Sequence, residues 1–367
     1  MQKIFRSVFG LLLIISSINY TFAEEHHEAK ETAKHEKFDA GEFIFDHIGD
    51  SHYWHIVTWK EKDVAVPLPV ILYSSNQGLN VFMSGKFHHG HSSYKNFRLM
   101  LEGDYKGKIV ELNNEGEILE NLPLDLSITK NVVAIFFSLA LMLWVFLSVA
   151  KTYTRRKDQA PKGLQNFIEP VIIFIRDEVA RPSIGEKKYE RYLPYLLMVF
   201  FFILLNNLLG LIPIIPGGAN VTGNITITMF LALCTFLITN ISAGKDYWKH
   251  IVNTPGVPWW LKIPLPIMPF VEFLGVLTKP FALMIRLFAN ITAGHIIALA
   301  FFSLIFFFAE MNVAVSYGVS VVTLAFTIFM TTLELLVAFV QAFVFTLLSA
   351  VFIGMAIEEH PHAEEHH

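Results

Sequence analysis

The residues best suited to chemistry lie in two long apolar segments near the carboxyl end of the chain. Arg286 stands among apolar neighbours in the first of them, residues 270–309. A charge inside a bilayer costs about 2.5 to 3.5 kcal/mol on insertion scales, so such a residue normally faces a protein interior or a watery cavity. Because arginine keeps its proton at every relevant pH, Arg286 would attract a carboxylate and repel a free proton rather than carry one.

Other polar residues share the segment with Arg286. Asn290 follows one turn later, and Lys279 and Glu272 precede it at two-turn intervals, which places all four near one face of a helix. Lys279 and Glu272 have two readings. They are either an ion pair at the cytoplasmic helix end or part of a path for ions.

A titratable pair is divided between the two long segments. His295 lies further along the first, and Glu334 lies in the second, with Gln341 two turns later on the same face. A lone histidine on an apolar helix is usually a hydrogen-bonded core residue, and a lone glutamate is often protonated. A histidine and a glutamate on adjacent intramembrane helices can instead pass a proton near neutral pH. Together these residues predict a proton path.

The two segments must be long helices to position these residues. Residues 319–353 contain no glycine or proline, so they predict one helix about 50 Å long, against a hydrocarbon core of roughly 30 Å. Its apolar composition indicates strong tilt rather than protrusion into water. The first segment contains Pro280 and Gly294, which we expect to interrupt it.

The whole composition favours a membrane protein. Hydrophobic residues make up 53% of the chain and charged residues 16%, which is too apolar for one soluble core of this length. Apolar runs at 132–150, 192–215 and 225–243 bring the number of predicted crossings to five. Residues 164–181 alternate apolar and charged side chains at helical spacing, which predicts an amphipathic helix on the cytoplasmic surface. We therefore expect an all-α polytopic membrane protein.

The amino-terminal segment and a cluster of basic residues indicate the orientation of the chain in the membrane. Residues 1–23 have the pattern of a signal peptide, and Lys and Arg gather just after the first crossing, between 151 and 162. These features predict a bacterial inner-membrane protein with an extracytoplasmic amino terminus. A channel domain then covers 128–357, and the tail at 358–367 is cytoplasmic.

Residues 24–127 form a predicted extracytoplasmic extension. Its first part is charged, and later stretches such as 55–59 and 78–82 suggest short strands between Gly, Pro and Asn breakers. A net charge of −4 argues against a nucleic-acid partner, and the single Cys234 excludes an intrachain disulfide and a cysteine metal site. We expect no cofactor and no metal.

Short motifs in the last two segments resemble a known family. Arg286 to Asn290 reads Arg-Leu-Phe-Ala-Asn and follows Lys279-Pro280, while Gln341 opens Gln-Ala-Phe. Over residues 128–360 the chain resembles subunit a of the F-type ATP synthase. The resemblance implies a non-catalytic stator channel subunit in membrane lipid, with b-type stator subunits and the remaining synthase subunits as partners.

The resemblance also implies roles for single residues. Two offset half-channels would press against a rotating ring of c subunits, each ring subunit carrying one essential carboxylate. Arg286 matches the arginine that faces this carboxylate and blocks a direct leak, and Asn290 and Gln341 match nearby polar residues. His295 and Glu334 fall where the family places a Glu and His pair, here exchanged between the two helices. Glu272 and Lys279 become candidates for the cytoplasmic half-channel. The choice between H⁺ and Na⁺ as the transported ion would lie chiefly in the surroundings of the ring carboxylate, and the His295 and Glu334 pair favours H⁺.

Two points stay open at this level. Residues 24–127 exceed the compact family pattern, and they either brace neighbouring stator subunits or shape the channel mouth. A self-contained cation/proton antiporter or channel is the alternative function, although such proteins usually carry inverted repeats. A passive membrane anchor would leave Arg286 and Glu334 without a role.

Overall fold

The structure is a computed structural model. It describes residues 39–59, 62–113, 115–119, 121–155, 160–212, 217–252, 267–311 and 313–358. The predicted signal peptide at 1–23 lies outside the described residues, as does the tail beyond residue 358.

The first described region is a short helix followed by small antiparallel sheets. Helix α2 spans Ala40–Ile48. Strand β1 (Tyr53–Trp59) pairs with β2 (Lys62–Pro67), β3 (Pro69–Ser74) lies between β4 (Gly78–Met83) and β7 (Leu124–Asp125), and β5 (Phe97–Leu99) pairs with β6 (Ile109–Glu111). The helical turn η1 (Ser84–Gly90) follows β4. The strands expected at 55–59 and 78–82 are thus present as β1 and β4.

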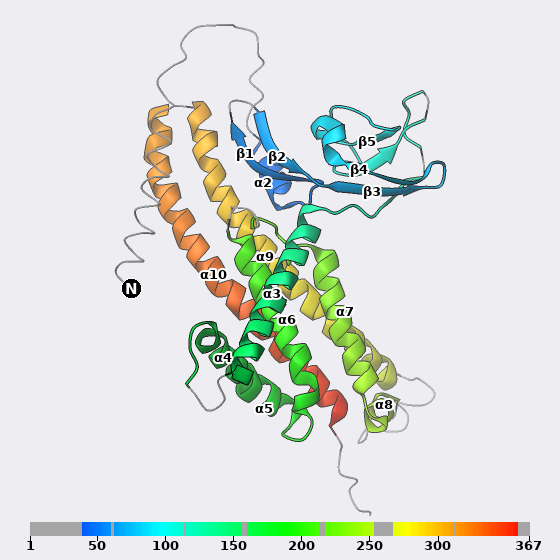
Figure 1. The fold of residues 1–367 in the computed structure, drawn as a ribbon, viewed down its shortest axis with the longest axis vertical. Helices are drawn as coiled ribbons and strands as arrows, with labels where there is room; N and C mark the ends of the chain where they lie inside the picture. The colour runs from blue at the N-terminus through cyan, green and yellow to red at the C-terminus, as the bar shows by residue number, and fades with distance from the viewer. Residues whose placement is uncertain are drawn as a thin grey trace, which may run out of the picture. The chain divides into compact units, whose positions relative to one another are not determined.

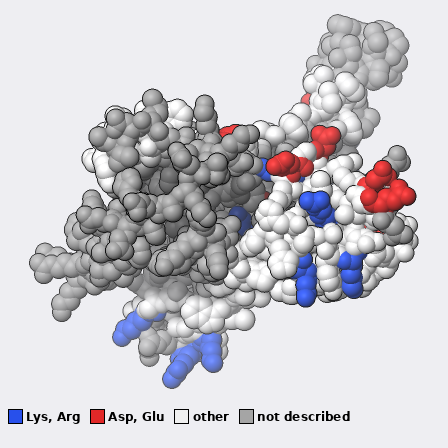
Figure 2. Space-filling model, turned by 90° about the horizontal axis from the view of Figure 1, so that it is seen from above, with Lys and Arg blue, Asp and Glu red and all other residues white. Residues whose placement is uncertain are grey.

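This β region has its own core. Side chains alternate along β3, so Val70 and Leu72 are fully buried, while Tyr73 points outward. Phe87 and Phe97 fill the same cluster and are also fully buried. Seen from above, the described surface carries acidic and basic residues scattered among uncharged ones (Figure 2).

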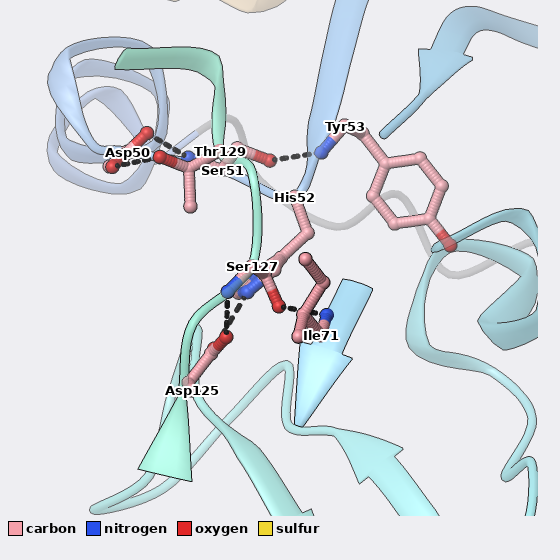
Figure 3. A network of polar contacts seen from close by, with 8 residues as sticks. All are labelled: Asp50, Ser51, His52, Tyr53, Ile71, Asp125, Ser127 and Thr129. Atoms are coloured by element: carbon pink, nitrogen blue, oxygen red, sulfur yellow. Dashed lines mark hydrogen bonds and ion pairs between the residues drawn. The ribbon is translucent and has the colours of Figure 1, made fainter. Parts of the chain in front are cut away.

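A polar network joins this region to the helix that follows it (Figure 3). The Asp50 carboxylate accepts hydrogen bonds from Thr129 Oγ1 at 2.8 Å and from the Asn131 amide at 3.1 Å. A second part of the network joins His52 Nε2 to Asp125 Oδ2 at 2.9 Å. Burial raises the pKa of Asp125, but hydrogen bonds from His52 and Ser127 outweigh it and hold this pKa below its ordinary value.

Five helices in the described part of the chain are long and apolar enough to cross a membrane. They are α3 (Lys130–Arg155), α6 (Tyr189–Gly210), α7 (Ile225–Ser242), α9 (Ile267–Met311) and α10 (Val313–Ile357). A shorter helix, α8 (Lys245–Val252), follows α7. The chain is an all-α multi-pass membrane protein with a small N-terminal β region, as the sequence predicts (Figure 1).

Helices α9 and α10 pack side by side in antiparallel directions (Figure 1). Each has 45 residues, or about 68 Å of helix. Ser316 Oγ donates to the Ile305 carbonyl at 3.2 Å, and the Phe301 and Phe326 rings lie 4.1 Å apart. The expectation that Pro280 and Gly294 interrupt the first helix is wrong, because α9 continues through both residues. A proline removes one backbone donor, and packing against neighbouring helices compensates for that loss.

The predicted amphipathic segment is a helical run divided into α4 (Leu164–Phe174), the π-helical η2 (Ile175–Ala180) and α5 (Arg181–Ile184). One face is fully buried at Ile175, Val179 and Ala180, where the run packs against α6 and α10. The other face leaves Phe167 74% exposed. The run therefore supports α10, one of the two helices that carry the predicted site.

Candidate functional site

His295 and Glu334 meet between α9 and α10. Nδ1 of His295 lies 3.7 Å from Oε1 of Glu334, and the two side chains are 18% and 11% exposed. The antiparallel packing of α9 on α10 brings together residues that are far apart in the sequence. At this distance a small displacement of either side chain would form a direct hydrogen bond.

The Glu334 carboxylate is held in a confined space. Its Oε1 atom is buried and has no hydrogen-bond partner among the described residues. Buried polar atoms are normally satisfied, by water when no protein group serves. Gly294 makes room for this carboxylate, because a Cβ at position 294 would lie 2.9 Å from Oε1.

A cavity of about 160 Å³ opens beside this pair. His295, Glu334 and Asn290 contribute polar groups to it, and the remaining lining is mostly apolar. Asn290 also lies on the exposed side of α9. The cavity therefore extends from the buried pair to the outer surface of the helix pair, one turn from Arg286, and it is large enough for several waters.

Two residues that sequence reasoning did not place in the site support one wall of this cavity. Asn207, near the end of α6, lines the cavity and donates from Nδ2 to the Ala338 carbonyl of α10 at 3.3 Å. Thr222 donates a short hydrogen bond to Asn207 Oδ1. The signal for Asn207 was two adjacent asparagines in an otherwise apolar run, which are costly unless they are hydrogen-bonded.

Arg286 faces away from the buried pair. It is exposed on α9, and within the described part of the chain its guanidinium forms no hydrogen bond or ion pair. The exposed residues of the same stripe include Ala282, Ala289 and Ala293. Small side chains allow another helix to approach closely. Arg286 thus stands on a shallow face that a second helix can reach.

Three other predicted site residues lie apart from this cavity. Gln341 is 8% exposed within α10 and does not line it. Towards the other end of α9, the Lys279 Nζ atom lies 5.6 Å from the centre of the Phe352 ring, and Glu272 is within electrostatic reach of Lys279. The structure therefore separates Lys279 and Glu272 from His295 and Glu334.

A small cavity beside Lys279 is polar on one side. It holds about 10 Å³, or roughly one water, and Thr239 and Asn240 of α7 line it. Thr239 Oγ1 and Asn240 Oδ1 are buried without a partner among the described residues. The site thus has polar interior groups on both sides of Arg286.

Comparison with known proteins identifies relatives of both regions. Residues 132–354 match the family described as ATP synthase A chain, and residues 43–129 match a domain of unknown function (DUF8433). ATP synthase subunit a of Chloroherpeton thalassium is 44% identical over 250 residues, which cover 66% of this chain and 70% of the relative. ATP synthase subunit a 2 of Chlorobaculum tepidum is 49% identical over 255 residues, covering 68% and 67%. The Myxococcus xanthus subunit a is 46% identical over 249 residues, covering 66% and 77%.

Proposed function

The chain belongs to the ATP synthase A chain family, and from this premise we propose that Arg286 separates two half-channels through which protons reach and leave a rotating ring. Membership makes the chain a proton-translocating stator subunit of the membrane sector, which functions together with the other ATP synthase subunits. It does not favour the self-contained antiporter. The residues and partners that carry the transport are the proposal.

The position of Arg286 between two separate polar regions carries this proposal. Along α9, Arg286 lies about 14 Å from the level of His295 and about 10 Å from the level of Lys279, at 1.5 Å per residue. A fixed positive charge between two hydrated regions repels a free proton and so opposes a direct leak. Protons must then pass through a group outside this chain.

The outer half-channel would end at the cavity beside His295 and Glu334. Glu334 and His295 can exchange a proton through water in this cavity, and Asn290 lies at its exposed edge. A carboxylate on a neighbouring helix could receive the proton there, next to Arg286. Gln341, buried within α10, would be a further polar group of the proton path.

The inner half-channel would begin near Glu272 and Lys279. Thr239 and Asn240 place unpartnered polar atoms beside Lys279. Lys and Arg residues between 151 and 162 favour the cytoplasmic side for this end of the helices. The chain would then lie in a bacterial inner membrane, with the β region outside and the carboxyl end in the cytoplasm.

The ring of c subunits would contact the stripe that carries Arg286. Ala282, Ala289 and Ala293 leave room for a ring helix, and a ring carboxylate would pair with the exposed guanidinium. The ring carboxylate would take up a proton from one half-channel and release a proton to the other when it pairs with Arg286. Each transferred proton would thus be coupled to a step of rotation. The b-type stator subunits would hold the chain against the turning ring.

Cysteine cross-linking tests the ring-facing stripe. In a Cys234→Ser background, Ala289→Cys on the exposed stripe is paired with a cysteine one turn from the ring carboxylate. Ile291→Cys is the matched control, because Ile291 is 7% exposed and faces the protein interior. We expect an oxidative cross-link with Ala289→Cys alone. Equal cross-linking of both, or none in an assembled complex, would contradict the proposed contact.

A further inference from the structure

The β region is attached at the point where the first crossing begins. The Asp50 carboxylate accepts a hydrogen bond from the backbone N–H of Asn131 in the first turn of α3. The backbone N–H of Lys130 donates to the Ser51 carbonyl at 2.9 Å. A carboxylate at a helix amino terminus satisfies free amides and complements the helix dipole. These bonds fix the β region against α3 at a defined position.

The Lys130 side chain also joins the start of α3 to α2. Its side chain is buried at the junction, and Nζ donates to the His47 carbonyl in the last turn of α2 at 3.4 Å. An ammonium at the carboxyl end of a helix is favourable because the unpaired carbonyls there carry partial negative charge. Lys130 therefore stabilises the carboxyl end of α2, which carries the exposed His47 side chain.

Helix α2 also packs on the far end of α9. The Phe43 ring lies 6.2 Å from the Phe306 ring of α9 and 5.7 Å from the His47 ring. His47 and Lys130 are both close enough to His295 for their charges to interact with it. The junction of α2 and α3 thus lies close to the proposed outer half-channel.

A continuous set of contacts leads from the β region to His295. Trp54 of β1 is 5% exposed and packs with Ala134 of α3 and with Ala219, in the connection between α6 and α7. A Cβ on Gly210, at the end of α6, would lie 3.3 Å from the Ala219 carbonyl oxygen and 3.7 Å from Nε2 of His295, so both atoms lie close to this glycine. The β region therefore contacts the wall of the cavity through one intervening layer.

The same layer contains polar atoms without partners. Asn131 Oδ1 and Asn220 Nδ2 are buried and have no hydrogen-bond partner among the described residues, like Glu334 Oε1 in the cavity. Unsatisfied polar atoms are rare in protein interiors unless water reaches them. Asn131 stands in the first turn of α3, and Asn220 lies next to Ala219 in the connection between α6 and α7, so both sides of this layer offer polar atoms to water.

From these contacts we infer that α2 and the beginning of α3 form the outer entrance of the proton path, and that the region matching the domain of unknown function holds this entrance in place. His47 lines the entrance, and Lys130 is a positioning residue that fixes α2 beside it. The inference rests on the proposed function. Of the two roles open for the extension, it selects the channel mouth over the bracing of stator subunits.

Reversible chemical blocking tests the entrance. In a Cys234→Ser background, His47→Cys is compared with Phe45→Cys, which lies on the same helix and is 66% exposed. A charged, membrane-impermeant methanethiosulfonate is added to spheroplasts. ATP-driven acidification is then measured in inverted vesicles, and mass spectrometry confirms labelling of both cysteines.

We expect labelling of His47→Cys to reduce pumping at least fivefold relative to the same variant before labelling, with recovery after thiol reduction. Labelled Phe45→Cys should keep its activity. Equal activity of both labelled variants would overturn the inference while leaving the proposed function intact, because the unlabelled proteins report that function separately.

Substitution of Lys130 gives a second, independent test. Lys130→Arg keeps a cationic donor for the His47 carbonyl, whereas Lys130→Met keeps the length and removes the donor. We expect Lys130→Met to reduce pumping several-fold in an assembled complex, and Lys130→Arg to restore most of it. Equal activity of the two variants would contradict a positioning role for Lys130.

Discussion

Gly294 of α9 lies directly against the carboxylate of Glu334 of α10. A Cβ at position 294 would lie 2.9 Å from Oε1 and 3.3 Å from Cγ of Glu334. We expect Gly294→Ala to displace the carboxylate from its position beside His295. Because the displaced atoms end a flexible side chain, the cost in stability should be at the low end of the range for overpacking, about 1 kcal/mol, whereas pumping should fall roughly three- to tenfold.

Gly275→Ala provides the control on the same helix, since a Cβ there meets nothing within 4 Å. ATP-driven acidification, normalised to assembled complex, compares the two variants. If Gly294→Ala pumps as well as Gly275→Ala, the position of the Glu334 carboxylate does not matter to transport.

His295 and Glu334 should act as one unit in proton transfer. Their Nδ1 and Oε1 atoms are 3.7 Å apart. We expect either single alanine change to reduce proton flux about as much as the double change, because each removes the same exchange step. Passive proton flux through vesicles stripped of the soluble ATPase head measures this. Losses that simply add would show that the two residues work independently.

The packing of the β region should depend on the ionised Asp125 carboxylate. The pKa of Asp125 lies below its ordinary value, so its contribution is present above the unfolded pKa of about 4 and is lost as the pH falls through the lower folded pKa. We expect Asp125→Asn to destabilise this region at neutral pH by on the order of 1 kcal/mol and to remove the acid dependence.

Amide hydrogen exchange in the intact complex, corrected for intrinsic rates, measures this between pH 3 and pH 6. The informative amides are those of Ile71 and Ser127, which donate to Ser127 Oγ and Asp125 Oδ1. Identical protection of the original protein and Asp125→Asn across this range would show that the carboxylate does not stabilise the network.

The sequence predicts the membrane helices because apolar length is a strong local signal. Residues 319–353 lack glycine and proline, and one helix covers them. The same signal could not show that α9 continues through Pro280, because packing against neighbouring helices determines whether a proline interrupts a helix. The interaction of His295 with Glu334 could be predicted from the sequence, because titratable residues inside a membrane are few and costly.

The supporting contacts could not be predicted in this way. The bond between Thr222 and Asn207 depends on how the connection from α6 to α7 folds back, and no periodicity encodes that. Lys130 reads in the sequence as an ordinary polar residue before a crossing. Only the packing of α2 on α9 brings it close to His295.

The most direct test of the account replaces Arg286 with alanine. ATP-driven acidification is measured in inverted vesicles, together with passive proton leak after removal of the soluble ATPase head. Arg98→Ala is the control, because Arg98 is an exposed arginine on β5, away from the helix pair. We expect Arg286→Ala to assemble, to lose pumping, and to keep or raise the leak, while Arg98→Ala pumps normally. Normal pumping by Arg286→Ala would contradict the role of Arg286 as the barrier between two half-channels.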